Sequence, residues 1–234
     1  MRDILKIPID RKVWLTSDTH GYHKNICYGT SIWNDKENST RKFDNELIMT
    51  QHIIDNINKY VAEDDILIHL GDWSFGGIEN IWNFRKQIKC KNIYLVLGNH
   101  DHHIRNNHIL PNVKRAEPYS SVLVDGKPGC YRGDDEYPDY VEAQTLFIEV
   151  EHYLEVLIDS TLFCCMHFPI EEWNDRGDSK IKNSYMIHGH SHGSSTSIND
   201  RLDVGMDSIF DILGRMRPIK SQEVIELIKS IKYE

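Results

Sequence analysis

One stretch, from Asn92 to Asp101, constrains the possible fold of this chain more than any other. It reads Asn-Ile-Tyr-Leu-Val-Leu-Gly-Asn-His-Asp, an apolar run that ends at Gly98 before an amide, an imidazole and a carboxylate. Such a run is typical of a strand buried on both faces. Open α/β sheets bind ligands at the carboxyl ends of their strands, so the polar side chains are candidates for a site. The alternative is a plain turn, because Gly-Asn is a common turn pair.

Strand-like and helix-like patterns alternate before this stretch. Short apolar runs predict strands, and apolar residues at helical spacing predict amphipathic helices between them. The resulting order is β-α-β-α-β, which implies a parallel sheet with crossover helices. The predicted elements are strands at Val13–Leu15, Asp65–Leu70 and from Asn92, with helices over Phe43–Val61 and 78–88.

The second half of the chain favours hairpins or a meander, followed by a final helix capped by Ser221. A segment at 126–142 is rich in Gly, Pro, Asp and Glu, and we expect it to form an acidic surface insertion. No repeat or linker divides the chain, so we expect residues 1–234 to form one α/β domain. The predicted elements are strands at Ser121–Asp125, Thr145–Asp159, Thr161–Met166, Ser184–Ile187 and Leu202–Met206, and a helix over Gln222–Lys232.

Composition excludes several classes of protein. The 36 acidic residues outnumber the 27 basic ones, which gives a formal charge of −9 and argues against general nucleic-acid binding. The five cysteines show no Cys-x-x-Cys spacing and read as reduced thiols rather than a disulfide framework. We find no signal peptide and no membrane-spanning run. These features predict a cytoplasmic protein with no membrane partner.

Five predicted strands each end in residues that commonly bind metals. In an extended backbone, residues i and i+2 point to the same side, so each Asp-x-His or His-x-His pair can aim two ligands at one spot. One such pair would more often be a helix cap beside a surface histidine, but five strand ends indicate a shared metal site. The blocks are Asp18-Thr19-His20, Gly71-Asp72, Gly98-Asn99-His100-Asp101, Met166-His167 and Gly189-His190-Ser191-His192.

These five blocks, in this order, resemble the calcineurin-like metallophosphoesterase superfamily. The resemblance runs from about Val13 to Pro218 and is strongest to small bacterial and phage members. Those members share the Ser-Asp-Thr-His opening with a following histidine (17–23), the stretch at 167–173 and the closing Val-Gly-Met-Asp…Arg-Pro-Ile. The resemblance implies a two-sheet α/β/β/α sandwich with a metal centre at the strand ends.

The resemblance also implies two divalent metal ions that share one bridging carboxylate, Asp72. The donors are imidazoles, carboxylates and an amide, without thiolate, which suits Mn, Fe, Zn, Co or Ni and does not choose among them, although we favour Mn. One ion would take Asp18, His20, Asp72 and His192, and the other Asp72, Asn99, His167 and His190.

His100 is the residue that the resemblance assigns to catalysis. It is similar to the imidazole that contacts the phosphate and protonates the leaving oxygen, although a histidine in a turn is the alternative. Asp101 would orient it or support the ligands, and Asn99 and His23 would also contact the substrate. A surface histidine remains an equal alternative for His23.

Other polar and aromatic residues carry weaker signals. Asp207 is a candidate to orient a ligand, whereas Asp203 stands where the family more often has Asn. We expect two further histidines at strand ends to be core or supporting groups, two arginines to be solvated, and four aromatic residues to line the mouth of the site or the core. These are His69 and His188, Arg41 and Arg105, and Trp33, Trp73, Phe75 and Trp173.

By resemblance, the expected activity is hydrolysis of small phosphodiesters, including nucleotides, through in-line attack by a metal-bridging hydroxide. A phosphomonoesterase would need extra arginines around the pocket, and a nuclease would need added basic or capping elements. A non-catalytic scaffold that binds proteins is the alternative from another class, since fold does not fix function. Such scaffolds lose ligands or the catalytic histidine, and this chain keeps all of them.

Overall fold

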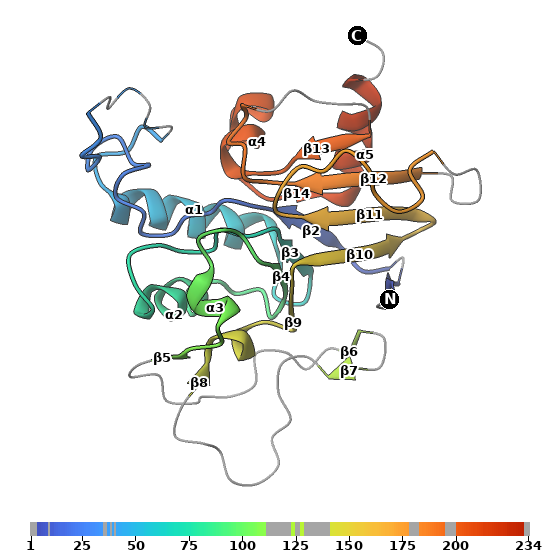
Figure 1. Cartoon of the computed structure of the whole chain (residues 1–234), viewed down its shortest axis with the longest axis horizontal. Coiled ribbons are helices and arrows are strands. Elements are labelled where there is room, and N and C mark those ends of the chain that lie inside the picture. The colour runs from blue at the N-terminus through green and yellow to red at the C-terminus, as the bar shows by residue number, and fades with distance from the viewer. Residues whose placement is uncertain are drawn as a thin grey trace, which may run out of the picture.

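Two five-stranded sheets form the centre of this protein (Figure 1). The computed structural model describes residues 4–8, 10–34, 37, 39, 41–110, 123–124, 127–128, 141–177, 183–194 and 200–231. The first sheet has the order β14 (Ile219–Lys220), β2 (Val13–Thr16), β3 (Ile66–His69), β4 (Asn92–Val96) and β9 (Glu149–Glu151). The second has the order β1 (Leu5–Ile7), β10 (Tyr153–Ile158), β11 (Thr161–Met166), β12 (Asn183–His188) and β13 (Arg201–Asp203).

Helices and short strands complete the described part of the chain. Two small ribbons pair β5 (Ile109–Leu110) with β8 (Val141–Glu142) and β6 (Leu123–Val124) with β7 (Lys127–Pro128). The helices are α1 (Glu46–Tyr60), α2 (Glu79–Arg85), α3 (His102–Arg105), α4 (Met206–Leu213) and α5 (Ser221–Ile231), with a 3₁₀ turn at Ala143–Leu146. None of the helices among these residues is long and apolar enough to cross a membrane.

The first sheet confirms the predicted β-α-β-α-β order. Strands β2, β3, β4 and β9 run parallel, and β14 pairs antiparallel with β2 at the edge. Helix α1 crosses from β2 to β3, and it begins where the side chain of Asn45 accepts hydrogen bonds from the backbone N–H groups of Leu47 and Ile48. Helix α2 makes the crossover from β3 to β4.

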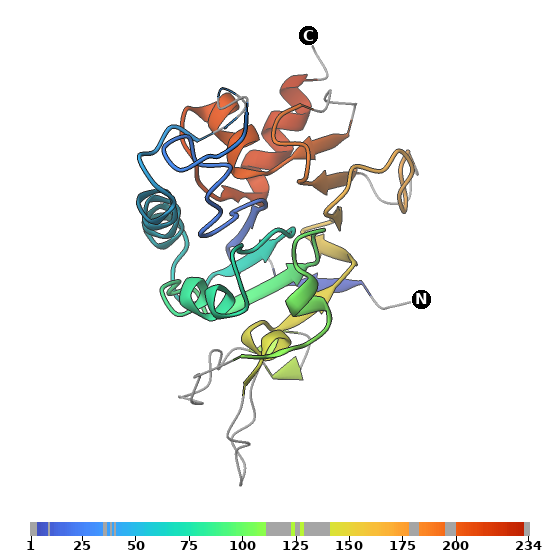
Figure 2. The same ribbon diagram turned by 60° about the vertical axis from the view of Figure 1, so that its left-hand side comes forward.

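Alternation along the central strands builds the core on both faces of the first sheet. One face, with Trp14, Leu67 and Leu95, packs against buried residues of α1 and α2. Figure 2 shows both helices on the same side of this sheet. The other face, with Leu15 and Ile68, packs against the second sheet. Helices α4 and α5 each add side chains to this inter-sheet layer. The expected architecture of two sheets flanked by helices is confirmed.

Several predicted boundaries were wrong. The expected strand Thr145–Asp159 is broken, because β9 pairs with β4 in the first sheet whereas β10 turns into the second. The expected strand Leu202–Met206 stops at Asp203, since Met206 already begins α4. The short strands β1 and β14 were missed. Most of the expected acidic insertion at 126–142 lies outside the described residues.

Candidate metal centre

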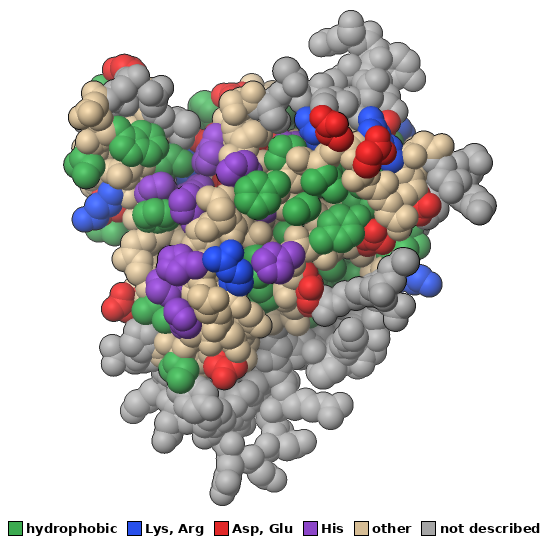
Figure 3. Space-filling model, viewed as in Figure 1, with side chains coloured by type: hydrophobic (Ala, Val, Ile, Leu, Met, Phe, Trp, Pro, Cys, Tyr) green, Lys and Arg blue, Asp and Glu red, His purple; other side chains and the backbone are tan. Residues whose placement is uncertain are grey.

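The five predicted ligand blocks meet at the carboxyl ends of β2, β3, β4, β11 and β12. Figure 3 shows histidine side chains gathered on this face of the molecule. Backbone hydrogen bonds tie the loops together: the N–H of Asp18 donates to Gly71 O at 2.9 Å, and that of His20 donates to Asp72 O at 2.9 Å. The N–H of Gly189 donates to His167 O at 3.0 Å. Residues as far apart in the sequence as Asp18 and His192 therefore share one small volume.

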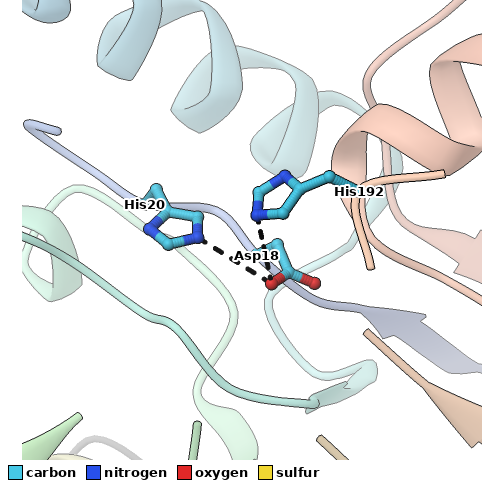
Figure 4. Close-up of side chains that lie close together, drawn as sticks. All are labelled: Asp18, His20 and His192. Atoms are coloured by element: carbon cyan, nitrogen blue, oxygen red, sulfur yellow. Dashed lines mark ion pairs between the residues drawn. The ribbon is translucent and has the colours of Figure 1, made fainter. Parts of the chain in front are cut away.

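Asp18, His20 and His192 form the first ligand group (Figure 4). The Nε2 atoms of His20 and His192 each lie 3.8 Å from the same oxygen, Oδ1 of Asp18. The other oxygen of Asp18 accepts a hydrogen bond from the backbone N–H of His190 at 2.9 Å. One carboxylate oxygen thus anchors the side chain, and the other faces two imidazoles.

Asp72 joins this group to a second one made with His167. Its Oδ2 lies 3.4 Å from Nε2 of His20 and 3.5 Å from Nε2 of His167. Its Oδ1 accepts a hydrogen bond from the backbone N–H of His100 at 2.9 Å. Ligand atoms about 2.0–2.2 Å from a cation stand roughly 3–3.5 Å apart, so these separations suit shared coordination.

His167 and Asn99 present two acceptors to each other. Nδ1 of His167 lies 2.7 Å from the carbonyl oxygen of Leu70, so this nitrogen carries the proton and donates it. In the neutral ring Nε2 then has a lone pair, and it lies 3.0 Å from Oδ1 of Asn99. Two lone pairs at this distance repel each other unless a cation lies between them.

Burial leaves polar atoms of the centre without partners. Oδ1 of Asp18 and both ring nitrogens of His20 are buried and lack a hydrogen bond among the described residues. Burial raises the pKa of Asp18 to about 7 and that of Asp72 to about 8. Burial also lowers the pKa of His167 to about 4 and that of His20 well below its usual value. Divalent cations would reverse the penalty on the carboxylates and match the neutral imidazoles, so the donor set fits metal ions.

The backbone is unusual at five of the seven predicted ligands. They have positive φ angles, a left-handed conformation that is uncommon outside glycine but tolerated by Asp and His. Such conformations cost of order 1–3 kcal/mol each and cluster at functional sites. The angles are 54° for Asp18, 46° for His20, 56° for Asp72, 68° for His190 and 47° for His192.

Two glycines make room for the carboxylates. A Cβ atom at Gly98 would lie 2.2 Å from Oδ1 of Asp72, and one at Gly189 would lie 2.3 Å from Oδ2 of Asp18. Glycine at these two positions therefore allows the close approach of the ligand loops to the carboxylates.

Arg41 corrects a prediction: it is fully buried rather than solvated. Its guanidinium binds both carboxylate oxygens of Asp207, at 3.1 and 3.0 Å, and also donates to the carbonyl oxygens of Asp18 and Thr19. Asp207 in turn accepts a hydrogen bond from Nδ1 of His192 at 2.6 Å. Asp207 therefore orients a candidate ligand, as expected, and a buried arginine holds Asp207 in place.

Nearby charges favour the ionised forms of Asp207 and His192. Burial opposes the charged form of Asp207, but the Arg41 guanidinium and the bond from His192 hold its pKa well below the usual range. Burial likewise opposes protonation of His192, but the hydrogen bond to Asp207 and the nearby carboxylates raise its pKa. Nothing in the sequence indicated that Arg41 would be buried against Asp207, because the two residues are 166 positions apart.

His100 and His23 lie at the open side of the centre. The His100 ring lies 5.5 Å from that of His20, and the His23 ring lies 5.2 Å from it, measured between centroids. Phe75 stacks on His23 at 3.8 Å and meets His100 edge-on at 5.1 Å. The structure thus brings both predicted substrate-contacting histidines beside the ligands, with Phe75 at the mouth.

Asp101 faces the backbone of the loops. Its carboxylate accepts hydrogen bonds from the N–H groups of Asp72, Trp73 and Gly98, at 2.8 to 2.9 Å. This places it as the residue that fixes two ligand loops against each other. His190 is exposed, with its ring 5.2 Å from that of His167.

The remaining candidates are not in the ligand groups. His69 and His188 are buried and hydrogen-bonded, to Thr19 and to Gly189, in the core or supporting position that the sequence predicted. Trp73 belongs to the core between the first sheet and its helices, where its Nε1 donates to Ile81 O. Trp33 and Arg105 are exposed.

Comparisons with known proteins agree with this geometry. The model of the family described as calcineurin-like phosphoesterase matches residues 11–194 of the 234. Among solved structures, this chain is similar to the crystal structure of the protein of unknown function AQ665 from Aquifex aeolicus. That alignment covers 93% of this chain and 100% of the other, with a TM-score of 0.55 and 18% identity, and it supports the fold alone. The search of curated proteins found no match.

Proposed function

This chain belongs to the calcineurin-like phosphoesterase family, and from that premise we propose that it hydrolyses phosphodiesters with two divalent cations. Membership implies metal-dependent hydrolysis of phosphoesters. The proposal adds the type of ester and the residues that bind the ions. The first ion would take Asp18, His20, Asp72 and His192, and the second Asp72, Asn99, His167 and His190.

One observation carries this assignment. Oδ2 of Asp72 lies between the two groups, 3.4 Å from Nε2 of His20 and 3.5 Å from Nε2 of His167. A carboxylate oxygen flanked by two neutral imidazoles suits a bridging ligand. Bound there, two divalent cations would supply the charge that acidifies a water molecule and clamps the attacking and leaving oxygens.

The chain's own residues would bind and protonate the substrate. His100 stands beside the cation ligands with its ring partly exposed, so it can reach the phosphate and give a proton to the leaving oxygen. His23 is held by its stacking on Phe75 and can contact a phosphate oxygen. Asp101 would fix the loop that carries His100 and act through position rather than contact.

A diester suits the charges around the site better than a monoester. The dianion of a monoester would favour additional guanidinium groups. Arg41, the arginine that lies closest to the ligands in the described part of the site, already binds Asp207 and two carbonyl oxygens. The groups left to face the substrate are imidazoles. Small diesters, nucleotides included, are therefore the proposed substrates, and the cytoplasm is the proposed location.

The test compares matched chromogenic diester and monoester substrates. The protein would be stripped of metal and supplied separately with Mn, Ni, Co, Zn or Mg, with Mn favoured for this donor set. We expect turnover to return with metal and to be greater for the diester. Turnover of the monoester alone would replace the proposed substrate class. No turnover with any metal, while two ions bind, would contradict the proposed function.

A further inference from the structure

A small cavity opens beside the candidate metal centre, between the loop that leads into α2 and the short helix α3. Its volume is about 270 Å³. Two buried side chains, Ile81 of α2 and Ile104 of α3, contribute apolar surface to it. Phe75, His100 and His103 contribute aromatic rings. Clefts for drug-sized ligands span about 300–1,000 Å³, so this cavity suits one small ring system.

His100 belongs both to the cavity and to the edge of the metal centre. Its ring lies 5.5 Å from that of His20 and 5.1 Å from that of Phe75. A substrate oxygen that receives a proton from His100 would therefore have the cavity directly beside it. The group attached to that oxygen is the leaving alcohol.

The cavity presents apolar and aromatic surface rather than charge. Among the described residues that line it there is no lysine or arginine. The one carboxylate, Asp101, already accepts three backbone hydrogen bonds. Aromatic rings favour the faces and edges of other rings, so the lining suits a flat, uncharged group.

Ser74 also lines the cavity, but its Oγ atom is buried. The surface open to a ligand is therefore made mainly of apolar and aromatic side chains.

We propose that this cavity receives the leaving group of the substrate and selects diesters whose leaving alcohol ends in an uncharged aromatic or heteroaromatic ring, as in a nucleoside. The inference rests on the proposed function, because it needs His100 beside the leaving oxygen. In the step, the water oxygen forms the new P–O bond and a water proton passes to solvent. The bond to the leaving oxygen breaks with its electron pair, and that oxygen takes the proton of His100.

The test uses three methyl phosphodiesters that release ethanol, cyclohexylmethanol or benzyl alcohol. These alcohols have similar acidity, so differences in rate report on binding of the leaving group. We expect kcat/KM for benzyl alcohol release to exceed that for cyclohexylmethanol by about three- to tenfold. In Phe75→Leu, which keeps apolar bulk but removes the ring, the ratio should fall toward one.

Phe168→Leu is the matched control. Phe168 is also partly exposed and lies beside two ligands of the second group, 4.7 Å from His190 and 5.0 Å from His167 between ring centroids, but it does not line the cavity. It should keep the benzyl preference. A wild-type ratio near one, an unchanged ratio in Phe75→Leu, or loss of the preference only in Phe168→Leu would overturn the pocket and leave the phosphodiesterase intact. Absence of turnover for all three diesters and for the chromogenic diester would instead refute the proposed function, and the pocket with it.

Discussion

The two halves of the candidate centre are built differently. Asp18 and His20 are buried, and His192 is held through Asp207 by the guanidinium of Arg41. In the other half His167 is fixed by a backbone carbonyl, whereas Asn99 and His190 are exposed. Asp72 lies between the halves.

The two halves differ in how firmly their ligands are held in place before a cation binds. A ligand whose partners already fix its orientation loses little entropy when a cation binds, whereas an exposed side chain must be ordered at that moment. We therefore expect the half with Asp18, His20 and His192 to bind its cation more tightly. The exposed half would bind more weakly and lie closer to solvent and substrate.

Removing the shared ligand should have the largest effect. Asp72→Asn takes a negative charge away from both halves, so we expect loss of both ions. Metal-ion catalysis contributes several kcal/mol, so activity should fall on the order of 10³–10⁵-fold. Metal content by mass spectrometry and diester turnover measure the two effects. Retention of both ions would contradict the bridging position.

His100→Asn should separate chemistry from metal binding. His100 donates only its backbone N–H to Asp72, and asparagine retains that bond. We expect both ions to stay bound while diester turnover falls about 10²–10⁴-fold, the usual range for loss of a general acid. His152→Gln, at an exposed histidine between β9 and β10, is the control. Equal turnover in His100→Asn and wild type would remove His100 from the mechanism.

Asp207→Asn tests the difference between the halves directly. The amide can still accept from His192 but no longer pairs with Arg41 by charge. Loss of such a supporting partner typically costs about 10–100-fold in metal affinity. Calorimetric titration of the metal-free protein with Mn should show weakening of one binding step and not the other.

Asp211→Asn, at an exposed aspartate one turn along the same helix, is the matched control for that titration. It should bind both ions as wild type does. Equal weakening of both steps in Asp207→Asn would mean that the two halves are one cooperative unit and would remove the proposed difference.

Sequence reasoning recovered the parts of this molecule that local patterns encode. Three of the four parallel strands, β2, β3 and β4, carry mostly apolar runs, and β11 was predicted with both of its ends at Thr161 and Met166. That the five ligand blocks share one site was predicted from their positions at the ends of strands. The identity of each ligand came from resemblance.

The remainder depends on contacts that no local pattern carries. Arg41 sits in a polar loop, where arginine is normally solvated, and only folding brings Asp207 to it. Strands of two or three residues, such as β1 and β14, are too short to show a period. The chain passes from the first sheet at β9 to the second sheet at β10. A continuous strand-like pattern in the sequence does not reveal this change of sheet.

The smallest predicted effect is a dependence of metal-free stability on pH. Burial raises the pKa of Asp18 to about 7 and that of Asp72 to about 8, so the folded chain keeps protons that an unfolded carboxyl loses near about 3.9. Because the unfolded state then binds fewer protons, the free energy of unfolding falls as pH rises. Between about pH 6.5 and 8 the loss should be about 2 kcal/mol.

The imidazoles do not cancel this loss. The pKa values of His20 and His167 are lowered, so they favour folding as pH rises, but only below about pH 6.5, where an unfolded imidazole gains its proton. Urea unfolding at several pH values, with chelator or with saturating Mn, measures the effect. With metal bound, the carboxylates are deprotonated ligands, so the free energy of unfolding should no longer fall across this pH range. If the metal-free protein instead gained stability as pH rose across this range, Asp18 and Asp72 would be ionised without a cation. The centre would then need no metal to balance its charge.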